Sequence, residues 1–219
     1  MSNSMQILLV INRKSIGRWT RYFHREYSQI DIKTVDFETL SSLDDEMLDC
    51  YSMVIICIET CKDLFEYKWH RKSTSNMKII HLINADKTMF QRMISHNMIL
   101  YKKGELRKCV EGLINAVRSD SIVALNCNDV LKLVSESECM LFQGTEGIKE
   151  EILFDVVANW MLSKSLKSSL VSIVGDITLA DASEICTLIQ TYTDEFFWVG
   201  CRYEETGRIN VSSLWRMLD

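Results

Sequence analysis

The sequence predicts an α/β fold, with a doubly wound, mostly parallel sheet in the first half and an α+β second half. Two observations predict this class. Short apolar runs alternate with segments of helical spacing through residues 1–103, a pattern typical of a parallel sheet covered by helices. After residue 118 the apolar runs are separated by longer amphipathic segments, which favours a mixed or antiparallel sheet. We therefore predict two domains, residues 1–118 and 119–219.

The strands of the first half are predicted from continuous or alternating apolar runs. Met5 to Ile11 (MQILLVI) is typical of a strand buried on both faces, and residues 53–58 and 78–83 repeat the pattern. Ile30 to Phe37 alternates and predicts a second strand, and Met98 to Tyr101 a short fifth strand. Ligand-binding loops of parallel sheets lie at the carboxyl ends of the strands, so we expect any chemistry there.

Helices are predicted between these strands. Ser15 to Glu26 carries apolar residues three and four positions apart, as one face of a helix requires. Ser42 with Asp45 predicts the capped start of a short helix that ends at Asp49. The other helices predicted in the first half cover residues 61–70, 86–96 and 105–118.

The second half is predicted to mix helices and strands. Its helices cover residues 128–136, 145–163 and 178–192, and its strands cover residues 139–142, 170–174, 196–202 and 208–214. Thr178 with Asp181 forms a variant capping box at the start of the third helix. The segment from Glu204 to Gly207 predicts a hairpin turn between the last two strands, with Gly207 in a positive-φ conformation.

Composition excludes several classes of function. The net charge of −5 argues against a dedicated nucleic-acid binder. A membrane span needs about 20 apolar residues, and every apolar run in this sequence is much shorter. The amino terminus lacks the pattern of a signal peptide. We therefore expect a cytoplasmic protein without direct membrane insertion. The eight cysteines form no C-x-x-C pair and the four histidines have no ligand spacing. We expect reduced, buried thiols, no metal site and no cofactor.

Three segments of the second half resemble the carboxy-terminal half of FtsZ, the bacterial relative of tubulin. IVALNCNDVLKLVSES resembles the family's catalytic loop and the helix that follows it. CMLFQGTEGIKEEILFDVVANWML resembles the next strand, glycine turn and long helix. ITLADASEICTLIQ, followed by an apolar strand, a Glu-Glu-x-Gly turn and a last strand, is the most specific piece. The resemblance implies that residues 1–118 are a reduced version of the family's nucleotide domain.

The phosphate-binding loops of the family are not matched. That family cradles GTP with glycine-rich loops, since only glycine lets backbone N–H groups approach phosphates closely. Here the first strand is followed by Asn12-Arg13-Lys14-Ser15, and the third by Glu59-Thr60-Cys61-Lys62-Asp63, without glycine. Arg13 and Lys14 form a basic group that can hold an anion, although charges at a loop start are more often solvated surface. Glu59 and Asp63 repel phosphate, with Lys62 nearby in the sequence. We therefore predict a degenerate GTPase without enzymatic activity.

The resemblance also supplies candidate partner-binding residues: Asn126, Asn128, Asp129 and Lys132. The family uses two acids in this loop to position water in the nucleotide site of the next subunit. The first acid matches Asn126 and the second Asp129, and an amide cannot accept the proton of water. Asp129 is equally well explained as an acidic residue favoured at a helix start.

Residues 1–118 also resemble a response-regulator receiver domain. A receiver carries an acidic pair after its first strand, an aspartate at the end of its third and a lysine after its fifth. Asn12 and Arg13 occupy the first position, Cys57 lies near the second, and Lys102 matches the third. Without the carboxylates there is no Mg²⁺ site, so this alternative is a pseudo-receiver. Cys57 lies inside an apolar run and is predicted to be a buried packing thiol.

The prediction for function is a non-catalytic FtsZ-like protein of cell division. It would bind FtsZ, or a related polymer, through the loop that includes Asn126 and Asp129 and would cap or inhibit assembly. The alternative is a structural, self-associating subunit or pseudo-receiver scaffold of another assembly, such as a pilus, secretion or partitioning machine. The expected partner is therefore an FtsZ-like filament protein or a second copy of this chain.

Overall fold

The computed structural model describes most of the chain. The described residues are 5–70, 78–85, 97–118, 121–122, 125–137, 139–160, 166–192 and 198–217. The helix predicted over residues 86–96 lies outside them. No helix among the described residues combines the length and apolar character that crossing a membrane requires.

Nine strands form one sheet with the order β2-β1-β3-β4-β5-β6-β9-β7-β8. The strands of the first half are β1 (Gln6–Val10), β2 (Asp31–Val35), β3 (Met53–Ile58), β4 (Ile79–Asn84) and β5 (Met98–Tyr101). Those of the second half are β6 (Cys139–Gly147), β7 (Leu166–Gly175), β8 (Trp198–Tyr203) and β9 (Ile209–Met217). Strands β1 to β6 pair in parallel, and β9 is antiparallel to both of its neighbours.

Helices cover both faces of the sheet. Those described are α1 (Ile16–Glu26), α2 (Phe37–Ser42), α3 (Asp45–Asp49), α4 (Cys61–His70), α5 (Leu106–Val117), α6 (Cys127–Ser135), α7 (Lys149–Asp155) and α8 (Leu179–Tyr192). In the first half, α1, α5 and α6 pack on one face, and α2, α3 and α4 pack on the other. Helices α7 and α8 cover the strands of the second half.

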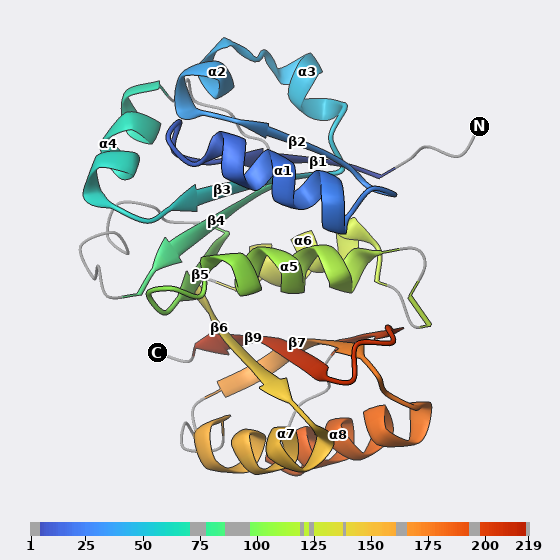
Figure 1. Cartoon of the computed structure of the whole chain (residues 1–219). Helices are drawn as coiled ribbons and strands as arrows, with labels where there is room; N and C mark the ends of the chain where they lie inside the picture. Colours follow the sequence, from blue (N-terminus) through green and yellow to red (C-terminus); the bar gives the residue numbers. More distant parts are fainter. Residues whose placement is uncertain are drawn as a thin grey trace.

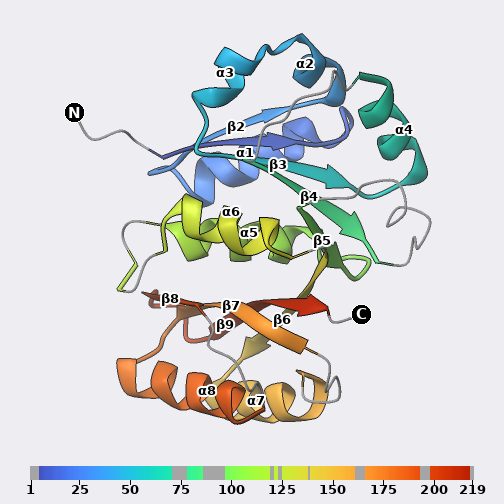
Figure 2. The same ribbon diagram turned by 180° about the vertical axis from the view of Figure 1, so that it is seen from behind.

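Helix α5 joins the two halves of the molecule. Figures 1 and 2 show α5 and α6 between the strands of the first half and those of the second. The glycine at position 112 of α5 faces Ser212 of β9, where an added Cβ would lie 2.8 Å from the serine Cβ. Gly200 of β8 lies against the backbone of Ala116 in the same way. These two close approaches let the strands of the second half pack directly on α5.

The strand predictions for the first half are confirmed. β1, β3, β4 and β5 lie within one residue of the predicted bounds at each end, whereas β2 ends at Val35, two residues before the predicted Phe37. Every residue of β3 and β4 is buried, because helices cover both faces, as continuous apolar runs indicate. The predicted domain boundary after residue 118 stays a prediction, and β5 and β6 pair directly across it.

The predicted long helix from Thr145 to Ser163 is wrong at its start. Thr145, Glu146 and Gly147 continue β6, where they pair with the first residues of β9. The helix begins only at Lys149, and a π-helical turn, Val156–Trp160, follows α7. The amphipathic spacing was correct from residue 149 onward, but pairing with a strand distant in sequence overrode it before that point. Residues 161–163 lie outside the described residues.

The predicted hairpin of the last two strands is also wrong. β8 pairs with β7 in parallel and β9 pairs with β6 and β7, so β7 separates the two strands. The chain from Glu204 to Arg208 crosses the end of β7 at Gly175, where an added Cβ would lie 2.1 Å from the carbonyl oxygen of Arg208. Gly207 does have a positive φ of 67°, but its turn leads over a strand instead of back along it.

Ser42, the predicted cap of the short helix that ends at Asp49, does not begin that helix. Ser42 is the last residue of α2, and Asp44 caps α3 by accepting a hydrogen bond from the backbone N–H of Met47 at 2.8 Å. An ionised carboxylate is the stronger acceptor at a helix start. The capping box of Thr178 and Asp181 at α8 is confirmed by hydrogen bonds in both directions.

Candidate functional site

The carboxyl ends of β1 and β3 meet through a buried polar network. Asn12 follows β1, and its side-chain N–H donates to Asp63 Oδ1 at 2.7 Å. The other oxygen of Asp63 accepts from the backbone N–H groups of Glu59 at 3.1 Å and Thr60 at 2.8 Å. Asp63 is only 2% exposed. The two loops that the resemblance compares with phosphate loops are therefore linked to each other by a carboxylate of the chain itself.

Thr60 and Asp63 form a capping box at the start of α4. The backbone N–H of Asp63 donates to Thr60 Oγ1 at 3.2 Å, while the carboxylate returns to the N–H of Thr60. Such N–H groups have no partner inside the helix, and they are the groups with which a helix start binds phosphate. Here Asp63 already occupies two of the backbone N–H groups around this helix start. The T-x-x-D pattern is readable in the sequence, although we had expected Asp63 only to repel phosphate.

Of the two basic residues after β1, Arg13 lies near acidic side chains. The guanidinium of Arg13 lies 3.6 Å from the carboxylate of Glu38 and 3.9 Å from that of Asp36. The hydrogen bond that Thr39 donates to Asp36, and to a lesser extent the charge of Arg13, lower the pKa of that carboxyl. The candidate anion group of Arg13 and Lys14 thus has one member already paired.

A cavity of about 420 Å³ lies beside this network. Arg18, Trp19 and Tyr22 of α1 line it together with Glu59 and the start of α5. Trp19 is 5% exposed, and its indole N–H has no acceptor among the described residues. Burial and Asp63 raise the pKa of Glu59, while Arg18 opposes them. The cavity lies between α1 and the start of α5, with Glu59 after β3 and Gly104 after β5 in its lining, and the carboxyl ends of parallel strands are where such sheets bind ligands.

Cys57 in β3 and Lys102 after β5 are the other two candidate positions that the sequence singled out in the first half. Cys57 is buried, and burial raises the pKa of its thiol well above the ordinary value, as expected of a packing thiol. All eight cysteines are free, but Cys50 and Cys61 are exposed, so the expectation of burial is wrong for these two. Lys102, the candidate receiver lysine, is exposed after β5.

The candidate partner-binding residues lie at the start of α6. Asn126 accepts from the backbone N–H of Asp129 at 2.9 Å, and Asp129 accepts from the N–H of Asn126 at 3.2 Å. This reciprocal pair is a second capping box. Asn128 and Lys132 are exposed and four residues apart, so they lie on one face of the helix. The structure therefore brings all four residues together on two turns, and Lys132 pairs with Glu136 at 3.8 Å.

Helix α5 separates these two places. Its first turn contributes Leu106 and Arg107 to the cavity, and its last turn is bonded to the α6 loop through the N–H of Leu125 and the carbonyl of Ala116. Twelve residues of helix span about 18 Å. The Asp63 network and the Asn126 loop thus lie at opposite ends of the central helix.

Comparison with known proteins identifies solved structures of similar fold. No protein-family model and no curated protein matches the chain. Solved structures do match. The W319Y mutant of FtsZ from M. jannaschii is similar over 98% of this chain and 92% of that chain, with a TM-score of 0.68 and 10% identity. CetZ from Methanosaeta thermophila covers 97% and 86%, with a TM-score of 0.60 and 9% identity.

A third similar structure shows the GDP form of TubZ protofilaments from Bacillus thuringiensis serovar israelensis. It matches 97% of this chain and 83% of that chain, with a TM-score of 0.51 and 7% identity. At these identities the likeness concerns the fold and its connections. The chain therefore has a fold similar to that of FtsZ, CetZ and TubZ, built on a mostly parallel nine-stranded sheet.

Proposed function

We propose that the chain is a non-hydrolysing FtsZ-like protein that binds an FtsZ-like filament through the start of α6 and limits its assembly. Such a protein docks on the exposed nucleotide end of a filament subunit and offers no nucleotide site of its own to the next subunit. It blocks further growth of the filament and catalyses no reaction.

The observation that carries this proposal is the position of Asp63. Its buried carboxylate caps α4 and holds Asn12 at 2.7 Å, where the resemblance compares the chain with loops that cradle phosphate. A phosphate would have to displace this carboxylate and lose three hydrogen bonds. It would also lie next to Glu59, so repulsion adds to the cost. These contacts support loss of nucleotide binding.

The start of α6 supports the docking surface. Asn126 and Asp129 satisfy each other, which fixes the start of α6 without a partner. The opposite face of the helix is fixed in the core by Val130 and Val134, both fully buried. Exposed Asn128 and Lys132 are then presented on a rigid helix, and a rigid surface loses little conformational entropy on binding.

The fold neighbours favour a filament as the partner. TubZ in the structure cited above is described as forming protofilaments in its GDP form. A filament subunit of this fold presents a complementary end to the next subunit, and a second copy of this chain is the other partner that such a surface fits. Self-association is therefore the second candidate function.

The test is a titration of the purified chain into FtsZ of the same cell, with GTP hydrolysis and polymer sedimentation followed together. Capping predicts inhibition at ratios well below one chain per FtsZ. No effect on hydrolysis or sedimentation at equimolar protein would contradict the modulator proposal. Concentration-dependent polymerisation of the chain alone would favour self-association.

A matched pair of variants locates the docking surface. Lys132 and Lys62 have nearly equal side-chain exposure, 73% and 74%, and each pairs with a glutamate four residues later. Lys132→Glu is expected to abolish inhibition, whereas Lys62→Glu on α4 is expected to leave it intact. Equal loss in both variants would show a general charge effect, and loss only in Lys62→Glu would place docking at the opposite end of the molecule.

A further inference from the structure

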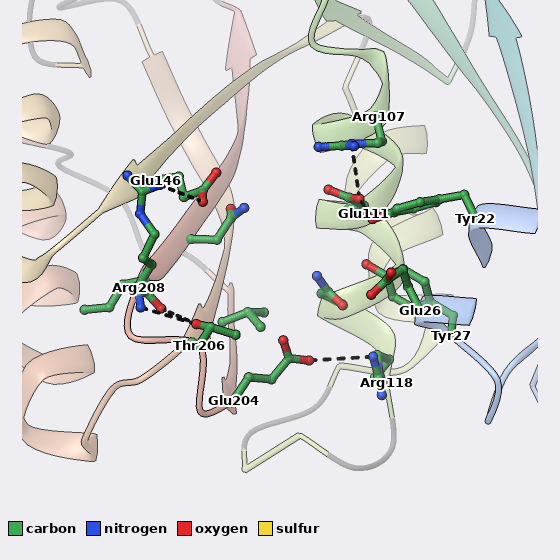
Figure 3. Close-up of a pocket in the computed structure, with 15 residues that line it drawn as sticks. Tyr22, Glu26, Tyr27, Arg107, Glu111, Arg118, Glu146, Glu204, Thr206 and Arg208 are labelled. Atoms are coloured by element: carbon green, nitrogen blue, oxygen red, sulfur yellow. Dashed lines mark hydrogen bonds and ion pairs between the residues drawn. The ribbon is translucent and has the colours of Figure 1, made fainter. Parts of the chain in front are cut away.

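A second cavity, of about 320 Å³, lies between the two halves of the molecule. One wall comes from α1 and α5, and the other from the ends of β6 and β7 and the start of β9 (Figure 3). Each of the four glutamates in its lining already has an arginine partner. These ion pairs therefore hold parts of the chain together, and the pair formed by Arg118 lies next to the docking surface.

Arg118 lies where α5 ends. Its backbone is extended, with φ −67° and ψ 129°, so the chain leaves the helix at this residue. Its side chain is nevertheless only 6% exposed. A charged side chain is almost never this buried unless it is paired, so contacts with other elements hold the guanidinium in place.

Two segments distant in sequence contact the guanidinium of Arg118. It lies 5.3 Å from the ring centre of Tyr27, the residue that ends α1, which is a cation–π contact. One of its nitrogens lies 4.0 Å from a carboxylate oxygen of Glu204, between β8 and β9 (Figure 3). The backbone N–H of Glu204 in turn donates to the carbonyl of Gly175 in β7 at 2.8 Å. The side chain of Arg118 thus joins the end of α5 to both halves of the molecule.

The last turn of α5 also holds the chain that leads to the docking surface. The carbonyl oxygen of Arg118 accepts from the N–H of Ser121 at 3.2 Å, and that of Ala116 accepts from the N–H of Leu125 at 3.0 Å. Leu125 directly precedes Asn126, the first residue of the docking surface. A displacement of the last turn of α5 is therefore transmitted to the start of α6 through these hydrogen bonds.

We infer that Arg118 is a positioning residue for the docking surface, because its side chain fixes the last turn of α5 and, through that turn, the start of α6. The inference rests on the proposed function, since docking at α6 gives the positioning its consequence. A surface that is already fixed loses little conformational entropy when the partner binds. If the surface is correctly placed for only a fraction of the time, its apparent affinity falls by that fraction.

Arg118→Met is the variant that tests this role. It keeps an unbranched apolar side chain in the buried place but removes the guanidinium and both of its contacts. Glu204 is not left unpaired, because Arg202 lies 2.8 Å from the same carboxylate oxygen. The matched control is Arg208→Met, the same change at an arginine of the same cavity, which pairs with Glu146 on the opposite wall.

Hydrogen exchange of the backbone amides of the whole chain tests the positioning without any partner. In Arg118→Met we expect the N–H of Leu125 to exchange at least about tenfold faster than in the wild type, because its acceptor is no longer held. The N–H of Leu64, bonded to Thr60 near the start of α4, should keep its wild-type rate. Arg208→Met should change neither rate. An unchanged rate at Leu125, or equal acceleration at Leu64, would overturn the inference.

A second variant keeps the test available if Arg118→Met does not fold. Arg118→Lys retains the positive charge beside Glu204 but lacks the planar guanidinium that stacks on the ring of Tyr27. We expect a several-fold acceleration at Leu125, smaller than in Arg118→Met. Wild-type exchange at Leu125 in this variant would show that the guanidinium does not position α6.

Inhibition of FtsZ assembly separates failure of the inference from failure of the proposed function. We expect Arg118→Met to need at least about tenfold more protein for half-inhibition, and Arg208→Met to inhibit like the wild type. A wild-type chain that does not inhibit contradicts the proposed function, and hydrogen exchange alone then decides whether Arg118 fixes the start of α6. Faster exchange at Leu125 with unchanged inhibition would overturn the role of Arg118 in docking.

Discussion

Helices α4 and α6 both begin with a capping box, but the two boxes lie in different surroundings. Each has a capping box in which a residue and the aspartate three positions later exchange hydrogen bonds. At α4 the aspartate is 2% exposed and also binds Asn12, 51 residues away. At α6 the box is local, and Asn126 is exposed.

The capping box of α4 is therefore part of the buried interior, whereas that of α6 lies at an exposed helix start. Asp63 ties two loops of the sheet edge together, and its buried carboxylate occupies the N–H groups of Glu59 and Thr60 just before α4. Asp129 shapes a loop and leaves neighbouring side chains accessible. The same four-residue spacing therefore fixes a buried junction of two loops at α4 and an exposed helix start at α6. The predictions below test this contrast.

The largest effect is expected for Asp63→Ala. The change leaves the N–H groups of Glu59 and Thr60 and the side-chain amide of Asn12 without their acceptor in a buried place. We expect a loss of about 3 kcal/mol in the free energy of unfolding, measured by urea denaturation. A loss below about 1 kcal/mol would show that water replaces the carboxylate easily and that the cap is not structural.

A smaller effect is expected for Asn12→Ala. It removes the bond between the two loops but leaves the Thr60 and Asp63 capping box intact. We expect a loss of about 1.5 kcal/mol in the same assay. In the double variant with Asp63→Ala the two losses should fall short of their sum, because both remove one interaction. Strict additivity would mean that the 2.7 Å contact contributes nothing.

The local box at α6 should matter less for stability. For Asp129→Ala we expect a loss of about 1 kcal/mol, typical of an exposed helix cap. The ratio between the Asp63 and Asp129 losses measures how far tertiary burial strengthens an identical motif. Equal losses from the two aspartates would contradict the contrast drawn here.

The smallest effect is expected at the third capping box, where Lys149 and Thr178 lower the pKa of Asp181 from 3.8 to about 2. A lowered pKa stabilises the fold above the unfolded value, and the contribution fades as pH falls through the folded value. Wild type should therefore lose more stability than Asp181→Asn between pH 4 and pH 2. Parallel acid-unfolding curves for the two proteins would exclude this linkage.

The parts of the fold that follow from local pattern were predictable. β1, β3 and β4 are continuous apolar runs, and such runs identify strands buried on both faces whatever their neighbours are. The capping box at α8 was readable for the same reason, since Thr178 and Asp181 are three residues apart. Thr60 and Asp63 show the same spacing, so the α4 cap could have been found.

Features that depend on distant pairing were not predictable from pattern. Thr145 to Gly147 read as the start of a helix but pair with β9, more than 60 residues later. The Glu204 to Gly207 turn signals a change of direction but not that β7 lies between the strands it joins. The contact from Asn12 to Asp63 likewise required the spatial order of β1 and β3. The candidate residues at α6 came from resemblance, and their role in partner binding stays a prediction.

Our central proposal is that the chain combines an FtsZ-like fold with loss of guanine-nucleotide binding, because the Asp63 carboxylate already accepts from the N–H groups of Glu59 and Thr60. Equilibrium titration of the purified protein with GTP and GDP, together with analysis of any nucleotide released on denaturation, tests this most directly. The account predicts no released guanine nucleotide and no saturable binding up to millimolar concentrations. Stoichiometric bound nucleotide, or saturable binding at micromolar concentrations, would contradict it.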